Sequence, residues 1–530
     1  MSNPLLLPEI VASVIDNVYM LPDLLSCACV NRVWNVAALK KLYKGSLHDM
    51  RLRTPDIGSL NCLLVSSPKR FARNMSFVKH LLLSPEQPTE NNGRGLASVA
   101  IPGQIKGQDW PDNIPDLLLT PTIEYLAIDK YYCVFLTDIP ADKFSNLKAL
   151  TVYKSDGDCR IDELCQLLQH CDLQFFHFEE DENPDDVLLT QSQIAEVLSC
   201  LQRHQNLKAL ALIVRNWPQP SILTKAWPRL KALYLEEGQD WLEQSPLPNF
   251  DELQILGLRN LYTIENIAEC RHLRVIELDS LELDDVETLL DIARGCPLLQ
   301  KFSMTRLNLR GDPDLGEEGE NLLLNLLRAL PKLEFLALGL KFRMDGALLL
   351  QDLARRCPRL AVLDLPRTQI WLSLAIMTNL DPLWQLEIMC LGDIYFEDTR
   401  RLLRSNNIES LATEWRRIFP RLREAQCSLR PLYMFREHSG EELEGDPASV
   451  SADEEMSLSE PGLDFDDEES DRLRRKLRRI LGYGKDYLTF IKIRYMWQTD
   501  FEIEAIGWPV VPSSAFYRPS WHSTSRCPAD

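Results

Sequence analysis

Cysteine and histidine are frequent metal ligands, and cysteine is also a strong nucleophile. The chain has 530 residues, with 14 cysteines and 8 histidines. Cys27 and Cys29 are separated by one residue, which is the wrong spacing for ordinary zinc ligands, and they fall on a predicted helix. Cys270 and His272 are also close, but no matching second pair accompanies them. We therefore expect no metal site and no cofactor.

Motifs for covalent chemistry are missing as well. The sequence contains no Gly-rich phosphate loop, no His-Glu-x-x-His and no Gly-x-Ser-x-Gly. No feature singles out one of the scattered cysteines as a nucleophile, and we interpret them as reduced, mostly buried residues of a cytoplasmic or nuclear protein. An enzyme built into the loops would lack any supporting motif, so we predict that the chain is not an enzyme.

Composition and charge exclude further classes of protein. The net charge of −20 argues against general nucleic-acid binding, which depends on neutralising phosphates. No run approaches 18 uncharged apolar residues, so we predict no membrane span. The N-terminus has no basic region before its apolar residues, and we expect no signal peptide. A hydrophobic content of 45% is ordinary for a globular chain with a large core.

Three short helical patterns follow one another at the N-terminus. Leu7-Pro8-Glu9 marks a helix start, because proline is tolerated in a first turn and a carboxylate suits the positive end of the helix dipole. Apolar residues recur at helical spacing from Ile10 to Val18. Pro22-Asp23 begins a second helix, and a third begins near Asn31. Helices this short cannot bury a core alone, so the element needs a partner surface.

These residues, at this spacing, resemble the F-box, the helical module that binds the Skp adaptor of cullin-based (SCF) ubiquitin ligases. The resemblance covers residues 4–45, and the pair Cys27 and Cys29 departs from the family pattern without changing the volume much. An ordinary amphipathic three-helix cap is the alternative. The resemblance implies that the adaptor is bound by the apolar signature positions Leu7, Pro8, Ile10, Leu24, Leu25, Val30 and Trp34.

A second pattern repeats along the chain, with an apolar residue, another three places later and another five places later. Successive copies begin 20 to 26 residues apart between residues 230 and 299, within the range of leucine-rich repeats. This spacing puts the apolar side chains on one side of a short strand. The copies begin at Ile123, Leu147, Leu173, Leu207, Leu230, Leu253, Leu273, Leu299, Leu333, Leu360 and Leu383, with further candidates at Val78 and Leu422.

We call each copy of this pattern a strand phrase and number its places from the first apolar residue. Helical segments separate these strand phrases. Examples are residues 286–294 and 347–356, and several such segments end at a proline, as at Cys296-Pro297 and Cys357-Pro358. Cys-Pro-x-Leu before a strand is similar to the repeats of F-box/leucine-rich-repeat proteins, fungal ones in particular. The pattern predicts an α/β solenoid with a parallel strand layer and outer helices, and an inserted loop at residues 87–116. An assorted α/β fold with a shared strand pattern is the alternative.

The C-terminal part changes character. Residues 436–471 contain fifteen acidic residues against one basic residue, a composition that predicts disorder. The run RLRRKLRR at residues 472–479 then indicates a basic amphipathic helix. It could serve nuclear import or contact an acidic surface, or it could simply be a solvated helix. We divide the chain into an F-box (1–45), a helical linker (46–77), the solenoid (78–430), the acidic segment (436–471) and a tail (472–530).

Together the patterns predict a substrate-recognition adaptor of an SCF-type ubiquitin ligase, bound to a Skp-type adaptor and through it to a cullin. The solenoid would bind an unknown protein substrate, and no nucleic acid or membrane is expected as a partner. A scaffold that assembles partners without ubiquitination is the alternative.

The substrate surface is predicted from the strand phrases. Where the first, fourth and sixth places are apolar, the third, fifth and seventh point to the other side of the strand. On a leucine-rich solenoid that side is the concave surface. Its residues are mostly acidic and aromatic, which favours a partner segment with Lys or Arg. The predicted contacts are Tyr153, His177, Glu179, Tyr234, Glu236, Arg259, Glu277, Asp279, Lys301 and Asp364; Asp129 and Glu387 occupy equivalent places.

Overall fold

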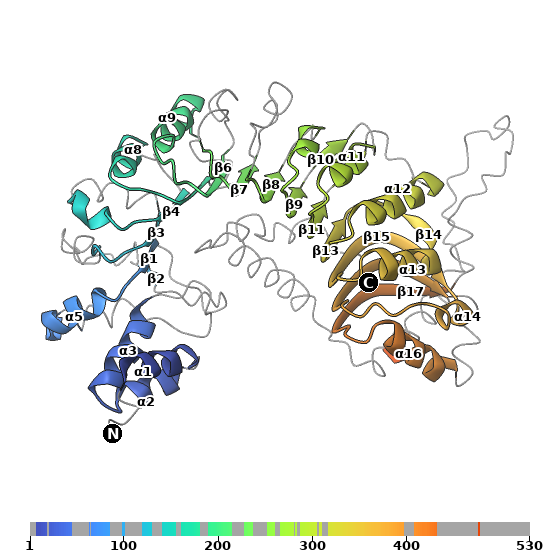
Figure 1. Ribbon diagram of the computed structural model, residues 1–530, viewed down its shortest axis with the longest axis horizontal. Helices are drawn as coiled ribbons and strands as arrows, with labels where there is room; N and C mark the ends of the chain where they lie inside the picture. Colours follow the sequence, from blue (N-terminus) through green and yellow to red (C-terminus); the bar gives the residue numbers. More distant parts are fainter. Residues whose placement is uncertain are drawn as a thin grey trace, which may run out of the picture. The chain divides into compact units, whose positions relative to one another are not determined.

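The computed structural model forms two compact units, one of residues 1–252 with 499–530 and one of residues 253–498. Each unit is a layer of parallel strands flanked by helices (Figure 1). The residues that the structure describes are 7–18, 21–44, 63, 65–84, 98–100, 119–129, 140–154, 161–180, 189–214, 227–236, 252–259, 265–279, 281–283, 287–304, 307–309, 316–396, 407–431 and 475–476. The predicted acidic segment 436–471 lies outside this part, as does the tail 472–530 except for Arg475 and Lys476.

Three helices open the first unit: α1 (Pro8–Asp16), α2 (Leu21–Ala28) and α3 (Arg32–Lys44). They agree with the three predicted helical patterns, and α1 and α2 both pack on α3. Their common core contains Val11, Ile15, Leu24 and Ala38. The Asn31 side chain begins α3 by accepting the backbone N–H groups of residues 33 and 34 at 2.9 and 3.1 Å. A further helix, α5 (Pro68–Met75), precedes the strands.

The first unit continues as seven parallel strands in the order β2-β1-β3-β4-β5-β6-β7. Helix α8 (Ile161–Gln169) packs against α9 (Gln191–Leu201), and a 3₁₀ helix, η3 (Ala141–Phe144), precedes β4. The strands are β1 (His80–Ser84), β2 (Ser98–Ala100), β3 (Tyr125–Asp129), β4 (Ala149–Lys154), β5 (Phe175–Glu180), β6 (Ala209–Ile213) and β7 (Ala232–Glu236).

The second unit has the parallel order β8-β9-β11-β13-β15-β16-β17, with β14 also paired to β15 and a separate pair β10-β12. Its strands are β8 (Ile255–Arg259), β9 (Val275–Asp279), β10 (Leu281–Leu283), β11 (Lys301–Met304), β12 (Leu307–Leu309), β13 (Phe335–Leu338), β14 (Arg343–Asp345), β15 (Val362–Leu372), β16 (Ile388–Phe396) and β17 (Glu424–Pro431). Its helices are η5 (Glu265–Glu269), α11 (Glu287–Gly295), α12 (Gly316–Ala329), α13 (Gly346–Arg356), α14 (Leu374–Met377) and α16 (Asn407–Ile418).

The predicted strand phrases coincide with these strands, and the fourth and sixth places are buried, as in Leu256 with Leu258 or Phe302 with Met304. The early and late candidates at Val78 and Leu422 are also in register, because β1 pairs with β3 and β17 with β16. Parallel strands need crossover connections, and among the described connections helix α8 lies between β4 and β5 and helix α9 between β5 and β6. Residues 98–100 of the expected loop 87–116 form strand β2 instead, paired to β1.

One predicted phrase is wrong by three residues. Leu363 of β15 is paired with Met389 of β16, and Leu365 of β15 is paired with Leu391 of β16. The phrase therefore begins at Leu386, not Leu383. Both leucines are buried and lie three places apart, so the spacing alone fits two registers. The shift moves Glu387 from the strand face to the second place of its phrase.

The residue at the second place of a phrase makes the same backbone hydrogen bonds in several repeats. Its carbonyl accepts two N–H groups from the next repeat: the Lys148 carbonyl, for example, accepts from the nitrogens of residues 174 and 175 at 2.7 and 3.0 Å. The same pair of bonds recurs at Lys208, Arg274 and Glu334. These bonds hold the second-place residues of neighbouring repeats beside one another along the edge where the strands begin.

Candidate functional site

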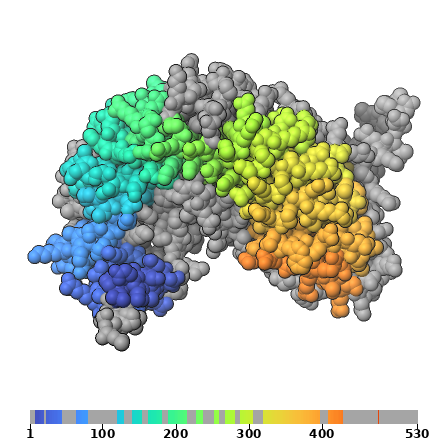
Figure 2. All heavy atoms as spheres, viewed as in Figure 1, coloured from blue at the N-terminus to red at the C-terminus, as the bar shows by residue number. Residues whose placement is uncertain are grey.

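An apolar face on the N-terminal helices is the clearest candidate site. Leu7, Ile10 and Val14 are 41%, 39% and 39% exposed, and Leu25 and Val30 are 51% and 60% exposed. Pro8 is exposed too. We call Leu7, Pro8, Ile10, Val14, Leu25 and Val30 the adaptor face, after the predicted adaptor contacts among them. The helices that carry it are the dark-blue atoms of Figure 2.

Helical periodicity separates this face from the core of the same three helices. Leu7, Ile10 and Val14 are three and four residues apart, so they share one side of α1. Val11 and Ile15 share another side and are fully buried. The family pattern did not include Val14, although the same three-and-four spacing in the sequence would have identified it.

Two of the predicted adaptor contacts pack within the helical element instead of on the exposed face, and a role in adaptor binding stays a prediction for both. Leu24 is fully buried between the helices, and Trp34 is half-buried against the same cluster. Their contribution is to hold α2 and α3 in place. The sequence cannot make this distinction, since core and interface residues of a small helical element are both apolar.

The arrangement of these exposed aliphatic side chains is suited to docking. Exposed aliphatic side chains on a packed, capped element bind by removing apolar area from water. Lys41 fixes the C-terminal end of α1 by donating hydrogen bonds to the carbonyls of Ile15 and Asp16 at 3.0 and 2.8 Å. The exposed side chains therefore sit on helices whose packing is already complete.

The predicted substrate contacts on the strand faces are mostly buried in this structure. His177, Glu179, Tyr234, Glu277, Lys301 and Asp364 are buried, and Asp279 is half-buried. The side chains of Tyr153, Glu236 and Arg259 lie outside the described part of the chain. A role in binding a partner stays a prediction, but in this conformation the described side chains do not form an open surface.

A charged pair marks the strand face of the second unit. The Lys301 ammonium forms an ion pair with Glu277 of the neighbouring strand and lies 4.9 Å from the centre of the Phe335 ring. Lys301 is fully excluded from solvent and Glu277 is nearly so. Removal of one partner from such a pair leaves a buried charge and is strongly destabilising. Charge reversal at Glu277 would thus disturb the fold itself, and it is not a clean test of substrate binding.

His177 holds the equivalent fifth place in the first unit. Complete burial lowers the pKa of His177 to about 3, so the imidazole is neutral near pH 7. Its Nε2 atom lies 3.6 Å from a Glu179 carboxylate oxygen. A neutral histidine in the strand layer agrees with a packing role.

The cysteines at the helix ends have a structural use that the sequence did not reveal. The Cys296 thiol donates to the carbonyls of Ile267 and Cys270 at 3.5 and 3.4 Å, and the Cys357 thiol donates to Leu327 and Leu330 at 3.6 Å. Burial raises the pKa of both thiols to about 12. They are protonated donors that join one repeat to the preceding one. Within the described residues no group of His, Cys, Asp and Glu is arranged to hold a metal ion.

Comparison with known proteins yields similarity to solved leucine-rich-repeat structures. No family model and no curated protein matches the chain. An internalin of Listeria monocytogenes is 15% identical with a TM-score of 0.32, over 55% of this chain and 77% of that one. A Leptospira interrogans leucine-rich-repeat protein is 14% identical with a TM-score of 0.32, over 70% and 90%. The Drosophila Toll–Spatzle complex is 9% identical with a TM-score of 0.31, over 60% and 57%.

The fold is that of a leucine-rich-repeat protein, on the evidence of its own repeats: parallel strands, one per phrase, with the apolar places buried. Among the helices in the described part of the chain, none combines the length and apolar character needed to cross a membrane.

Proposed function

We propose that the chain is a substrate-recognition adaptor of an SCF-type ubiquitin ligase. The observation that carries the proposal is the adaptor face, which leaves Leu7, Ile10, Leu25 and Val30 exposed on a packed three-helix element. These positions match the apolar signature of the F-box, and a small element with such a face needs a partner surface. A Skp-type adaptor is the partner that the signature implies, with a cullin joined through it.

The solenoid supplies the second half of the proposal. Leucine-rich-repeat folds present long strand and helix surfaces for protein binding. Catalysis would then be by proximity, because a substrate held beside a charged conjugating enzyme reacts at a high effective concentration. The chain itself would form no covalent intermediate, and the substrate would be a protein.

Direct binding of a purified Skp-type adaptor tests the first half. A double change of Leu7 and Pro8 to Ala should weaken binding by more than about tenfold, because apolar anchors at an interface centre typically contribute roughly 2 kcal/mol or more. Val65→Ala is the matched control, since Val65 is 82% exposed and lies outside the adaptor face. Undiminished adaptor capture by the double variant would contradict the proposal.

A scaffold that binds the adaptor without causing ubiquitination is the alternative function. Two measurements distinguish it: co-purification of a cullin with the intact chain, and turnover of a captured partner that depends on residues 7–44. We expect both for a ligase adaptor. A captured partner whose half-life is the same with the intact and the Leu7 and Pro8 variant chains supports the scaffold.

A further inference from the structure

In each of the two units, a row of side chains runs along the edge where the strands begin, one from each repeat. The row consists of the second-place residues, which the paired backbone bonds described above hold beside their neighbours; Lys231 belongs to it because its N–H group donates to the Lys208 carbonyl. Neighbouring members are one strand apart, about 4.8 Å along the sheet. Long side chains from adjacent repeats are therefore within reach of one another.

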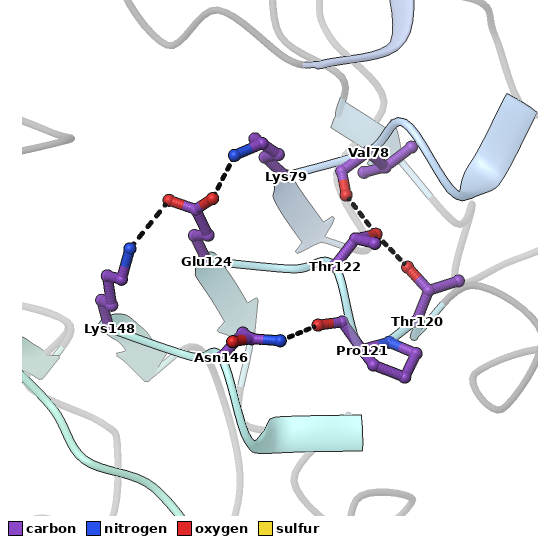
Figure 3. A network of polar contacts seen from close by, with 8 residues as sticks. All are labelled: Val78, Lys79, Thr120, Pro121, Thr122, Glu124, Asn146 and Lys148. Carbon is purple, nitrogen blue, oxygen red and sulfur yellow. Dashed lines mark hydrogen bonds and ion pairs between the residues drawn. The ribbon is translucent and has the colours of Figure 1, made fainter. Parts of the chain in front are cut away.

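Most contacts in this row join a charge to an opposite charge or to an amide. Figure 3 shows the example at the start of the first unit, where two lysines flank one carboxylate and hold its pKa below the ordinary value through side-chain hydrogen bonds. Like charges directly opposite on adjacent strands are destabilising, which favours this alternation. The contacts are Lys79 and Lys148 with Glu124, Gln300 with Glu334 at 3.2 Å, and Arg423 with Glu387 at 3.4 Å.

Strands β6 and β7 instead place two like charges in neighbouring members of the row. Lys208 and Lys231 hold the second place in consecutive repeats, and the Lys231 N–H donates to the Lys208 carbonyl at 2.7 Å. In the part of the chain that the structure describes, neither ammonium group has an ion pair or a hydrogen bond. Arg229, exposed two residues before Lys231, donates a 3.1 Å hydrogen bond to Asn206. We call Lys208, Arg229 and Lys231 the basic edge.

The acidic group nearest along the same edge is already engaged. Asp172 precedes β5 and accepts a 3.1 Å hydrogen bond from Asn206, the residue that also binds Arg229. The edge of β5 to β7 thus carries three cations and one carboxylate in its described part. In a chain with net charge −20, such a cluster runs against the composition.

We propose that the basic edge binds an acidic segment of a partner protein, a run of Asp and Glu side chains. The adjacent lysines repel one another in the free protein, and an anionic ligand removes that repulsion while it gains two attractive contacts. A polynucleotide fits less well, because its binding depends on neutralising many phosphates and the basic edge offers three cations. The basic edge contains no residue of the adaptor face, so this inference does not depend on the proposed adaptor function.

Fluorescence anisotropy of a labelled octaglutamate peptide with the full chain tests the proposal. Lys208→Glu with Lys231→Glu should weaken binding about tenfold or more at low ionic strength and reduce the salt dependence. Lys208→Gln with Lys231→Gln should cause a smaller loss. The control, Lys69→Glu with Lys332→Glu, makes the same change in net charge at exposed positions elsewhere and should stay within about twofold.

Several results would overturn the proposal. They are no binding of octaglutamate by the intact chain, equal weakening in the control, or tighter binding of an oligonucleotide of equal charge. The chain's own acidic run must also be tested as the occupant, by changing Asp466, Asp467, Glu468 and Glu469 to Asn or Gln. Unchanged affinity for the peptide supports a separate partner, and a gain of about tenfold would assign the basic edge to that run instead. Adaptor capture should be unaffected in every variant.

Discussion

At the scale of single residues, two opposite charges in the strand layer stabilise each other by forming an ion pair. Lys301 is fully buried, and its ammonium group contacts Glu277 and the Phe335 ring. Taking both charges out of water is costly, and the mutual attraction offsets that cost only while both are present. The pair therefore contributes little by comparison with apolar residues, but loss of either residue removes this attraction from a charge that stays buried.

A double-mutant cycle measures this coupling. Lys301→Met alone and Glu277→Gln alone should each lower the free energy of unfolding of the chain by about 3 kcal/mol. The double variant should lose clearly less free energy of unfolding than the sum of the two single variants. It removes both charges, so neither one is left buried without the other. Urea unfolding followed by circular dichroism provides the values. Strict additivity would show that the two side chains do not stabilise each other.

At the scale of elements, adjacent residues of helix α2 have separate roles. Leu24 is fully buried against α1 and α3, whereas Leu25 is 51% exposed. One turn of helix therefore places a core residue beside an exposed residue. This contrast allows folding and binding to be tested separately with the same chemical change.

Leu24→Ala should destabilise the three-helix element by about 2–5 kcal/mol, because it leaves a cavity in a small core. Leu25→Ala should change the free energy of unfolding by about 0.5 kcal/mol or less but weaken adaptor binding about tenfold. Thermal unfolding and adaptor capture are measured on both variants. A loss of stability with Leu25→Ala would contradict this assignment. Normal adaptor binding by a folded chain that carries both Leu24→Ala and Leu25→Ala would contradict it as well.

At the scale of the whole molecule, the repeats should act as one array. Helix α11 buries Leu289 and Ile292 and packs on η5 before it and α12 after it. Each repeat thus covers its neighbours, and stability is shared along the series. If the repeats fold as one array, two fragments made by dividing the chain within it should not fold separately.

A cut near Val286, at the start of α11, should yield two insoluble fragments, because it exposes core on both sides of the break. Solubility and circular dichroism of the separately expressed fragments provide the measurement. Co-expression of the two fragments is the control and should restore a soluble complex. Two fragments that each fold with native-like spectra would contradict the single array.

The sequence by itself determined the repeat: apolar residues three and then two places apart predict which side of a strand is buried, and prolines predict where helices such as α11 and α13 end. These are local properties of spacing and backbone geometry. The tertiary structure decided the register of β16, where Leu383 and Leu386 both fit the pattern, because register depends on which residues of β15 lie opposite. It also decided exposure, placing Leu24 in the core and Leu25 on the surface, and burying Glu277 and Lys301 on a strand face expected to be open. Spacing shows which way a side chain points, whereas burial depends on what other parts of the chain pack against it.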